Sequence, residues 1–138
     1  MRVKSFRVKR SAPVGEYKLS EIFAGLESSS ALLKVFGSRS QMTKIMKHLT
    51  SAKSDFLYLD VIHVLVHVKQ FLDGRELYDQ AFEYVDRPTE LEAYRTTVAE
   101  ARRVGMDEDE ILRYLRMDAA DDSELGKLME KIGVKARR

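Results

Sequence analysis

Residues 56–69, FLYLDVIHVLVHVK, are the stretch on which the predicted fold depends. They are rich in β-branched and aromatic side chains, which favour strands. Both alternating faces of such a strand would be largely apolar, and a strand of that kind belongs in the middle of a sheet. We therefore predict a central strand here. A helix is the alternative for its second half, because a short apolar run does not separate the two.

The flanking sequence extends this prediction to an α+β fold, with a small sheet packed with helices and a helical carboxy-terminal part. An extended strand or arm is expected over residues 2–10, and a short apolar strand over residues 31–36. Apolar side chains at helical spacing predict early helices from residue 20 and over residues 42–49.

Downstream of residue 73 the pattern is helical throughout. Two capping boxes are expected, Thr89 with Glu92 and Asp107 with Glu110, and glycines are well placed to end two of the helices. The expected helices cover residues 76–85, 89–104, 107–117 and 122–132, with Gly105 and Gly133 as terminators.

The composition is that of a globular protein, with 138 residues, 44% hydrophobic and 33% charged. We expect one compact domain with two parts, a basic α/β part at 1–88 and a helical part at 89–138. Cysteine is absent, which excludes disulfides and thiolate chemistry. No apolar run approaches the roughly 20 residues of a membrane span, and no signal peptide is recognised, so a cytoplasmic location is expected.

Charge is distributed unevenly along the chain. Residues 1–53 carry a net +8, residues 54–130 a net −10 and residues 131–138 a net +4. Separated charge of this kind indicates an anionic partner at the basic surface.

The amino-acid usage resembles that of hyperthermophiles. Asparagine and tryptophan are absent, thermolabile residues are few, and Glu, Lys and Arg are abundant.

The basic amino-terminal segment is the predicted nucleic-acid-binding surface. Cations neutralise phosphates, and interleaved flat side chains stack with unpaired bases. A solubilising terminus with ordinary core aromatics is the alternative. The candidate residues are the cations Arg2, Lys4, Arg7, Lys9, Arg10, Arg39, Lys44 and Lys47 and the aromatics Phe6, Phe36 and Tyr58.

A helix-turn-helix motif is the second pattern considered, over the segment around Gly105. Its second helix would begin with four carboxylates, residues 107–110, which repel phosphates. We therefore interpret this segment as a helix pair for packing or self-association. Its arginines, Arg102, Arg103, Arg113 and Arg116, are expected to pair with neighbouring acids.

His63 and His67 are the third pattern. Four residues apart on a helix they could share a metal ion, but on a strand they would lie about 13 Å apart. No third ligand group stands at suggestive spacing, so we interpret the two as buried or interface histidines satisfied by hydrogen bonds. We expect no metal site, no cofactor and no catalytic residues. Catalytic motifs are also missing, since the sequence contains no Gly-rich phosphate loop, no Gly-x-Ser-x-Gly and no His-Glu-x-x-His.

Three segments together resemble the ThermoDBP-related proteins of archaea: SALLKVFGSRSQMTKIMKHL (30–49), FLYLDVIHVLVHV (56–68) and AYRTTVAEARRVGMDEDEILRYLRM (93–117). The resemblance is one of architecture and composition. It implies an amino-terminal domain that binds single-stranded DNA and carboxy-terminal elements that drive oligomerisation. No binding residue is carried over from that family.

The expected function is therefore non-enzymatic binding of single-stranded DNA or RNA, with DNA favoured, by a homo-oligomer that does not enter membranes. A structural protein associated with ribosomes or ribonucleoproteins is one alternative. A protein-interaction adaptor whose acidic helices dock a basic partner is the other.

Overall fold

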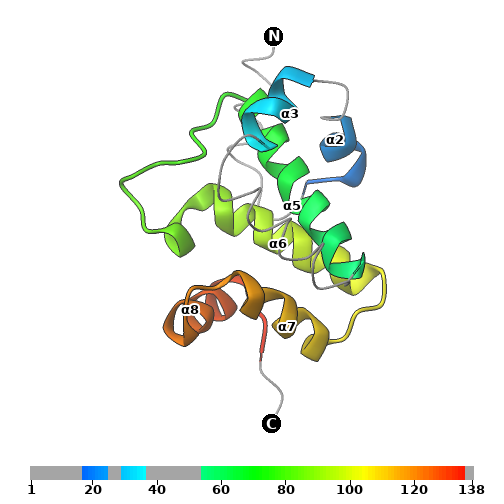
Figure 1. The fold of residues 1–138 in the computed structure, drawn as a ribbon, viewed down its shortest axis with the longest axis vertical. Helices are drawn as coiled ribbons and strands as arrows, with labels where there is room; N and C mark the ends of the chain where they lie inside the picture. The colour runs from blue at the N-terminus through cyan, green and yellow to red at the C-terminus, as the bar shows by residue number, and fades with distance from the viewer. Residues whose placement is uncertain (1–16, 25–28, 37–53, 136–138) are drawn as a thin grey trace.

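The computed structural model describes residues 17–24, 29–36 and 54–135, and every regular element in this part of the chain is a helix (Figure 1). Two short helices, α2 (Leu19–Phe23) and α3 (Ser29–Phe36), precede the long helix α5 (Ser54–Leu72). A 3₁₀ turn, η2 (Tyr84–Asp86), leads into the remaining helices, which are α6 (Pro88–Arg103), α7 (Glu108–Asp118) and α8 (Asp122–Ile132).

The predicted small sheet is wrong, because the described residues contain no strand. The expected central strand, residues 56–69, lies inside α5, so the helix left open as an alternative is correct and covers the whole stretch. The expected strand over residues 31–36 belongs to α3. The predicted arm at residues 2–10 and the helix at 42–49 lie outside the described residues.

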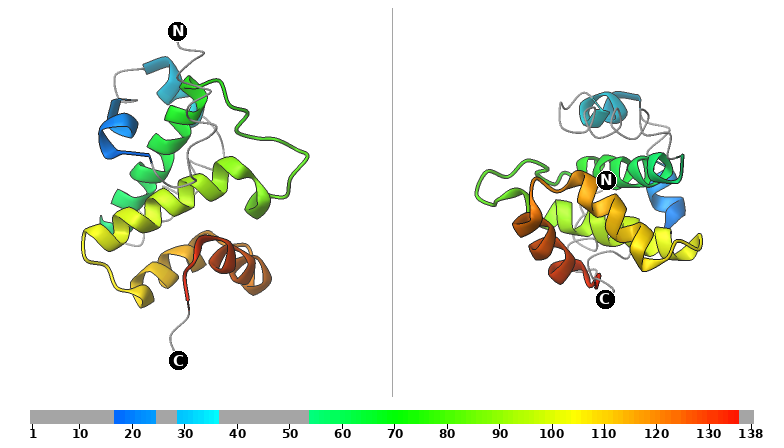
Figure 2. Two further views of the ribbon diagram at one scale, coloured as in Figure 1. Left: turned by 180° about the vertical axis from the view of Figure 1, so that it is seen from behind. Right: turned by 60° about the horizontal axis from the view of Figure 1, so that its bottom comes forward.

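Helix α5 is the central element of the fold. It packs most extensively against α6, while α2 and α3 pack on α5 and α8 packs on α6 (Figures 1 and 2). Helix α7 contacts α8 and also reaches α5, where the ring of Tyr114 packs edge-on against Phe56. Within the described residues, none of the helices combines the length and apolar character needed to cross a bilayer.

Three apolar clusters contact α5 and explain why most of its side chains are apolar. Its first turns enter the largest cluster, which also holds side chains of α6, α7 and α8. Its middle packs with Ile22 of α2 and Ala93 of α6. Val64 and Val68 pack against α3 and Leu77. Because α5 is buried on nearly every side, its sequence lacks the broad polar face of a surface helix, and its β-branched residues favoured a strand.

The predicted helix over residues 76–85 is also wrong. Residues 73–83 form turns and bends, with Leu77 and Val85 buried but Tyr78 and Ala81 exposed. Local side-chain bonds offer the backbone an alternative to the helix. The Asp79 carboxylate accepts from the Ala81 N–H at 2.9 Å, and Glu76 accepts from the Tyr78 N–H at 3.2 Å.

The last two helices follow the prediction closely. Asp107 caps α7 and forms the expected capping box with Glu110, and α8 ends at Gly133 in the left-handed conformation (φ 77°). The other predicted capping box is wrong, because α6 starts at Pro88 with Arg87 as its cap. Glu92 is instead drawn into contacts with α5 and the following loop.

Alanine substitutions at two glycines, one within α8 and one at its carboxy-terminal end, are expected to change stability in opposite directions. We expect Gly133→Ala to destabilise the protein by about 1 kcal/mol, because an L-residue is strained at this left-handed position. Gly126→Ala lies within α8 with open space around the new methyl group, so it is expected to stabilise by roughly 0.5–1 kcal/mol. Urea unfolding of both variants provides the measurement. Equal effects at the two positions would contradict the assigned end of α8.

Candidate functional site

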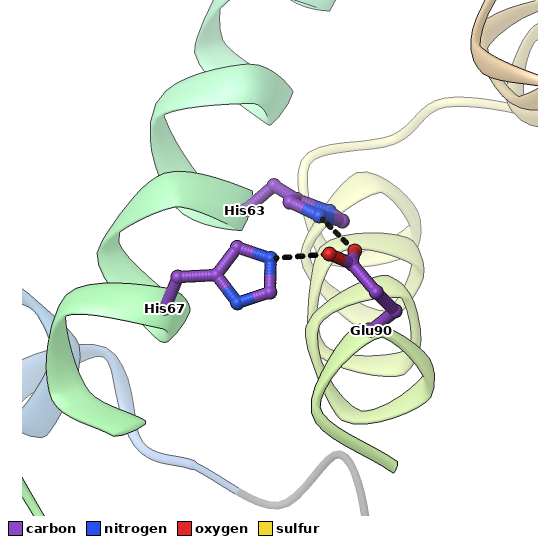
Figure 3. Close-up of side chains that lie close together, drawn as sticks. All are labelled: His63, His67 and Glu90. Atoms are coloured by element: carbon purple, nitrogen blue, oxygen red, sulfur yellow. Dashed lines mark hydrogen bonds and ion pairs between the residues drawn. The ribbon is translucent and has the colours of Figure 1, made fainter. Parts of the chain in front are cut away.

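The chemically unusual feature of the structure is a cluster of two histidines and a glutamate between α5 and α6 (Figure 3). His63 and His67 are four residues apart on α5, so both rings leave the same face of the helix. Glu90 lies in the first turn of α6 and points back at them. The rings are 4.8 Å apart at their centroids and inclined by 75°.

Each oxygen of the Glu90 carboxylate faces one imidazole. Oε1 lies 3.1 Å from Nε2 of His63, and Oε2 lies 3.3 Å from Nε2 of His67. The second contact is within ion-pair distance but lacks the geometry of a hydrogen bond. The ring of Tyr94 packs edge-on against His63 with centroids 4.5 Å apart, which closes the cluster on the α6 side.

Water has almost no access to the cluster. His63 is 0% exposed, and His67 and Glu90 are each 2% exposed. Burial, the largest influence, raises the pKa of Glu90, but the charge of His67 and the polar contacts with both rings outweigh it. The pKa of Glu90 therefore lies well below its usual range. The carboxylate is ionised at neutral pH, and it is held inside the protein by the two imidazoles.

Gln70 fixes the orientation of His67. Its amide nitrogen donates to the carbonyl oxygen of Thr89 at 3.0 Å and to Glu92 at 2.8 Å, and both of these partners only accept. Its amide oxygen must then face Nδ1 of His67, 2.8 Å away. Nδ1 is consequently the donor, and Nε2 of the same ring is the atom directed at Glu90.

A second polar layer surrounds Gln70. Glu92 accepts from Arg75, whose guanidinium also donates to the hydroxyl of Tyr17 at 3.3 Å. Burial and the nearby charge of Glu92 raise the pKa of Tyr17, so this hydroxyl stays protonated. These contacts join α5, α6, the loop after α5 and the residue preceding α2, so the cluster is held from several elements.

The arrangement suits ion or proton binding better than catalysis on a substrate. Two imidazole nitrogens and a carboxylate that converge within 4.8 Å of one another are a common donor set for transition metals. A catalytic centre must also admit its substrate, and these three side chains are sealed between packed helices. The geometry therefore supports a closed site.

Most of the residues predicted to bind nucleic acid lie outside the described part of the chain. They are Arg2, Lys4, Phe6, Arg7, Lys9, Arg10, Arg39, Lys44 and Lys47. Phe36 is the last residue of α3, and its side chain is among those not described.

Tyr58 is the one predicted binding residue whose side chain is described. Its hydroxyl donates to Glu100 on α6, and its ring packs partly against the apolar clusters. Its remaining surface lines a shallow hollow with Asp55 and Glu110. Two carboxylates at this position disfavour a nearby phosphate, although base stacking by Tyr58 stays a prediction.

The prediction that His63 and His67 are buried and satisfied by hydrogen bonds is confirmed. Their convergence with Glu90 was missed because the strand prediction separated the two rings by about 13 Å. On a helix the spacing of four brings them together. Glu90 could not be assigned as their partner from spacing, since it follows His63 by 27 residues and approaches only because α6 packs on α5. The helical alternative for residues 56–69 was the signal that pointed to the pair.

Fold and site together define an all-helical chain, over the described residues, with a buried histidine–glutamate cluster between its two central helices. Comparison of the sequence and structure with protein-family models, curated proteins and solved structures found no match.

Replacing Gln70 tests the network around His67. In Gln70→Leu the imidazole Nδ1–H, the Thr89 carbonyl and Glu92 lose their buried partner, so we expect a loss of about 2–3 kcal/mol in the free energy of unfolding. Gln80→Leu is the control, because Gln80 is exposed and makes only a local contact to Tyr78. It is expected to change stability by less than about 0.5 kcal/mol. Similar losses in chemical unfolding of both variants would contradict a network centred on Gln70.

Proposed function

We propose that this chain is a non-enzymatic protein of the cytoplasm that binds single-stranded nucleic acid, with DNA favoured over RNA. Its basic segments form the binding surface, and the helical body serves as their scaffold. The observation that supports the proposal is the excess of positive charge over residues 1–53, which precede the acidic stretch 54–130.

The charge separation is one along the sequence. The full chain holds 24 Lys and Arg against 22 Asp and Glu. Residues 1–53 hold 11 Lys and Arg against 3 acids, whereas residues 54–130 hold 9 against 19. The predicted phosphate-binding cations all lie within residues 1–53. An excess of this size attracts polyanions and makes their binding salt-dependent.

Several cations of the helical body are paired with its own acids. In the described residues, six ion pairs join a Lys or Arg to an acid. They are Lys69–Asp73, Arg75–Glu92, Arg102–Glu108, Arg103–Glu100, Arg116–Asp122 and Lys131–Asp86. The predicted pairing is thus confirmed for Arg102, Arg103 and Arg116. The body as a whole presents a net negative surface that disfavours phosphates.

Duplex reading by the helix pair around Gly105 gains no support. Helix α7 begins at Glu108, and the residues of its first turn are Glu108, Asp109 and Glu110. A recognition helix brings this end to the bases and phosphates of the major groove. The interleaved Phe6 in the basic segment instead favours single strands, whose unpaired bases stack on aromatic rings.

Charge neutralisation at matched positions tests this proposal. The triple variant Arg7→Gln, Lys9→Gln and Arg10→Gln removes three cations from the basic segment. We expect it to weaken binding of a labelled single strand at least about tenfold at low salt. Each phosphate contact adds roughly 0.7 to the magnitude of the slope of log affinity against log salt, so the loss of three contacts should lower this magnitude by about 2. Fluorescence anisotropy over a salt series, with DNA and RNA strands in parallel, provides the measurement.

The control removes the same charge from the helical body. Arg113→Gln, Lys127→Gln and Lys135→Gln alter three exposed residues outside the six ion pairs, and affinity and slope are expected to stay close to those of the unaltered protein. Equal weakening by both triple variants would show only a response to net charge. Absence of binding by the unaltered protein at low salt would rule the function out.

Self-association is part of the proposal. Among the described residues, four of the six large exposed apolar side chains lie in the segment 71–82: Phe71, Leu72, Tyr78 and Phe82. The other two are Phe23 of α2 and Val104 at the end of α6, within the predicted oligomerisation part. We expect light scattering at micromolar concentration to give a multiple of the 15.9 kDa chain mass. A monomer mass over the whole concentration range would contradict a homo-oligomer.

A further inference from the structure

We infer that His63, His67 and Glu90 form a closed binding site for a divalent first-row transition metal, with Zn²⁺ as the best match. Nε2 of each histidine and the carboxylate of Glu90 are the ligands. The site joins the middle of α5 to the first turn of α6, so its role is to hold the two central helices together. This inference is independent of the proposed function.

The distances in the cluster match those between ligands of a tetrahedral zinc ion. Zn–N and Zn–O bonds of about 2.0–2.1 Å at tetrahedral angles place neighbouring ligand atoms about 3.3 Å apart. The nitrogen–oxygen distances here are 3.1 and 3.3 Å. All three ligand groups lie within 4.8 Å of one another, so a small rotation of the rings closes the set around one ion.

The hydrogen bonds of Gln70 also leave His67 suited to bind a metal. Gln70 accepts from the Nδ1–H of His67, so Nε2 is the atom free to act as a ligand, and it lies 3.3 Å from the Glu90 carboxylate. That contact lacks the geometry of a hydrogen bond and lies in a place that water barely reaches. A metal ion would bind Nε2 of both rings together with the carboxylate.

The donor set and its support select the class of metal. Imidazole nitrogens with one carboxylate suit Zn²⁺, Co²⁺ and Ni²⁺, whereas Mg²⁺ and Ca²⁺ prefer sets made of oxygen alone. An outer group that accepts from the distal N–H of a metal-bound histidine is a regular feature of such sites, and Gln70 has that position. The three side chains supply three of the four positions of a tetrahedral ion, and the packed helices around them leave no access for a substrate.

Metal content after refolding tests the inference on the unaltered full chain. Protein is unfolded with a chelator, refolded with Zn²⁺ or Co²⁺ and freed of loose metal by gel filtration. We expect one metal per chain, a cobalt spectrum of the intense tetrahedral type, and a melting temperature on the order of 10 °C higher at metal concentrations about 100-fold above Kd. Refolding allows loading of a buried site that has no open path in the folded protein.

Variants then locate the metal. The double variant His63→Gln and His67→Gln, and separately Glu90→Gln, are expected to lower affinity at least about 100-fold. Gln70→Met is expected to lower it about 10- to 100-fold, because it removes the group that orients His67. Tyr58→Phe is the matched control, since it breaks another side-chain bond between α5 and α6, to Glu100, and should leave one metal per chain.

Two outcomes would overturn the inference. Metal-free protein after refolding with Zn²⁺ and Co²⁺, with an unchanged melting temperature, would identify the cluster as a proton-bridged ion pair. One metal per chain in the double histidine variant would place the ion elsewhere. Variants that fail to fold do not obscure the result, because metal content and the cobalt spectrum of the unaltered chain decide the first point.

Discussion

Each of the three apolar clusters in the described structure contains side chains of α5, so little of this helix faces water. Its polar side chains must therefore find partners inside the protein, because an unpaired buried polar group costs more free energy than a hydrogen bond returns. Asp60, His63, His67 and Gln70 are all buried, and they follow one side of the helix at intervals of three or four residues. The partners come from α6 and α7, which fixes how those helices pack on α5.

This constraint explains the choice of residues on the opposing helices. Tyr114 of α7 donates to Asp60 at 2.8 Å, and burial with nearby carboxylates raises the pKa of that hydroxyl, which keeps it a donor. The Glu90 carboxylate of α6 contacts both histidines, and Glu92 accepts a hydrogen bond from Gln70. A carboxylate in such a place is strongly destabilising without cationic or donor partners. The polar layer therefore specifies the pairing of α5 with α6, while the apolar clusters supply most of the stabilisation.

Local signals predicted the end of the chain well and its middle poorly, for the same physical reason. Asp107, Glu110 and Gly133 act through hydrogen bonds and backbone angles within a few residues, so the sequence alone locates α7 and α8. Helix α5 is buried by neighbours on nearly every side, so its apolar residues follow no helical period and only its buried polar residues keep one. The histidine pair was recognised from its spacing, but Glu90 joins it only through the packing of α6. Tertiary contacts of this kind carry no local pattern.

The two features to which a chemical role is proposed are the basic amino-terminal segments and the buried histidine–glutamate cluster. Charges on the surface act over about 10 Å at moderate salt, so the acidic first turn of α7 repels phosphates only in its neighbourhood. The histidine–glutamate cluster is sealed from solvent, and a phosphate cannot reach it. A metal ion there would act on the proposed binding through the stability of the α5–α6 pair. Loss of the metal should accordingly lower the temperature up to which nucleic acid is bound, with little effect on affinity well below the melting transition.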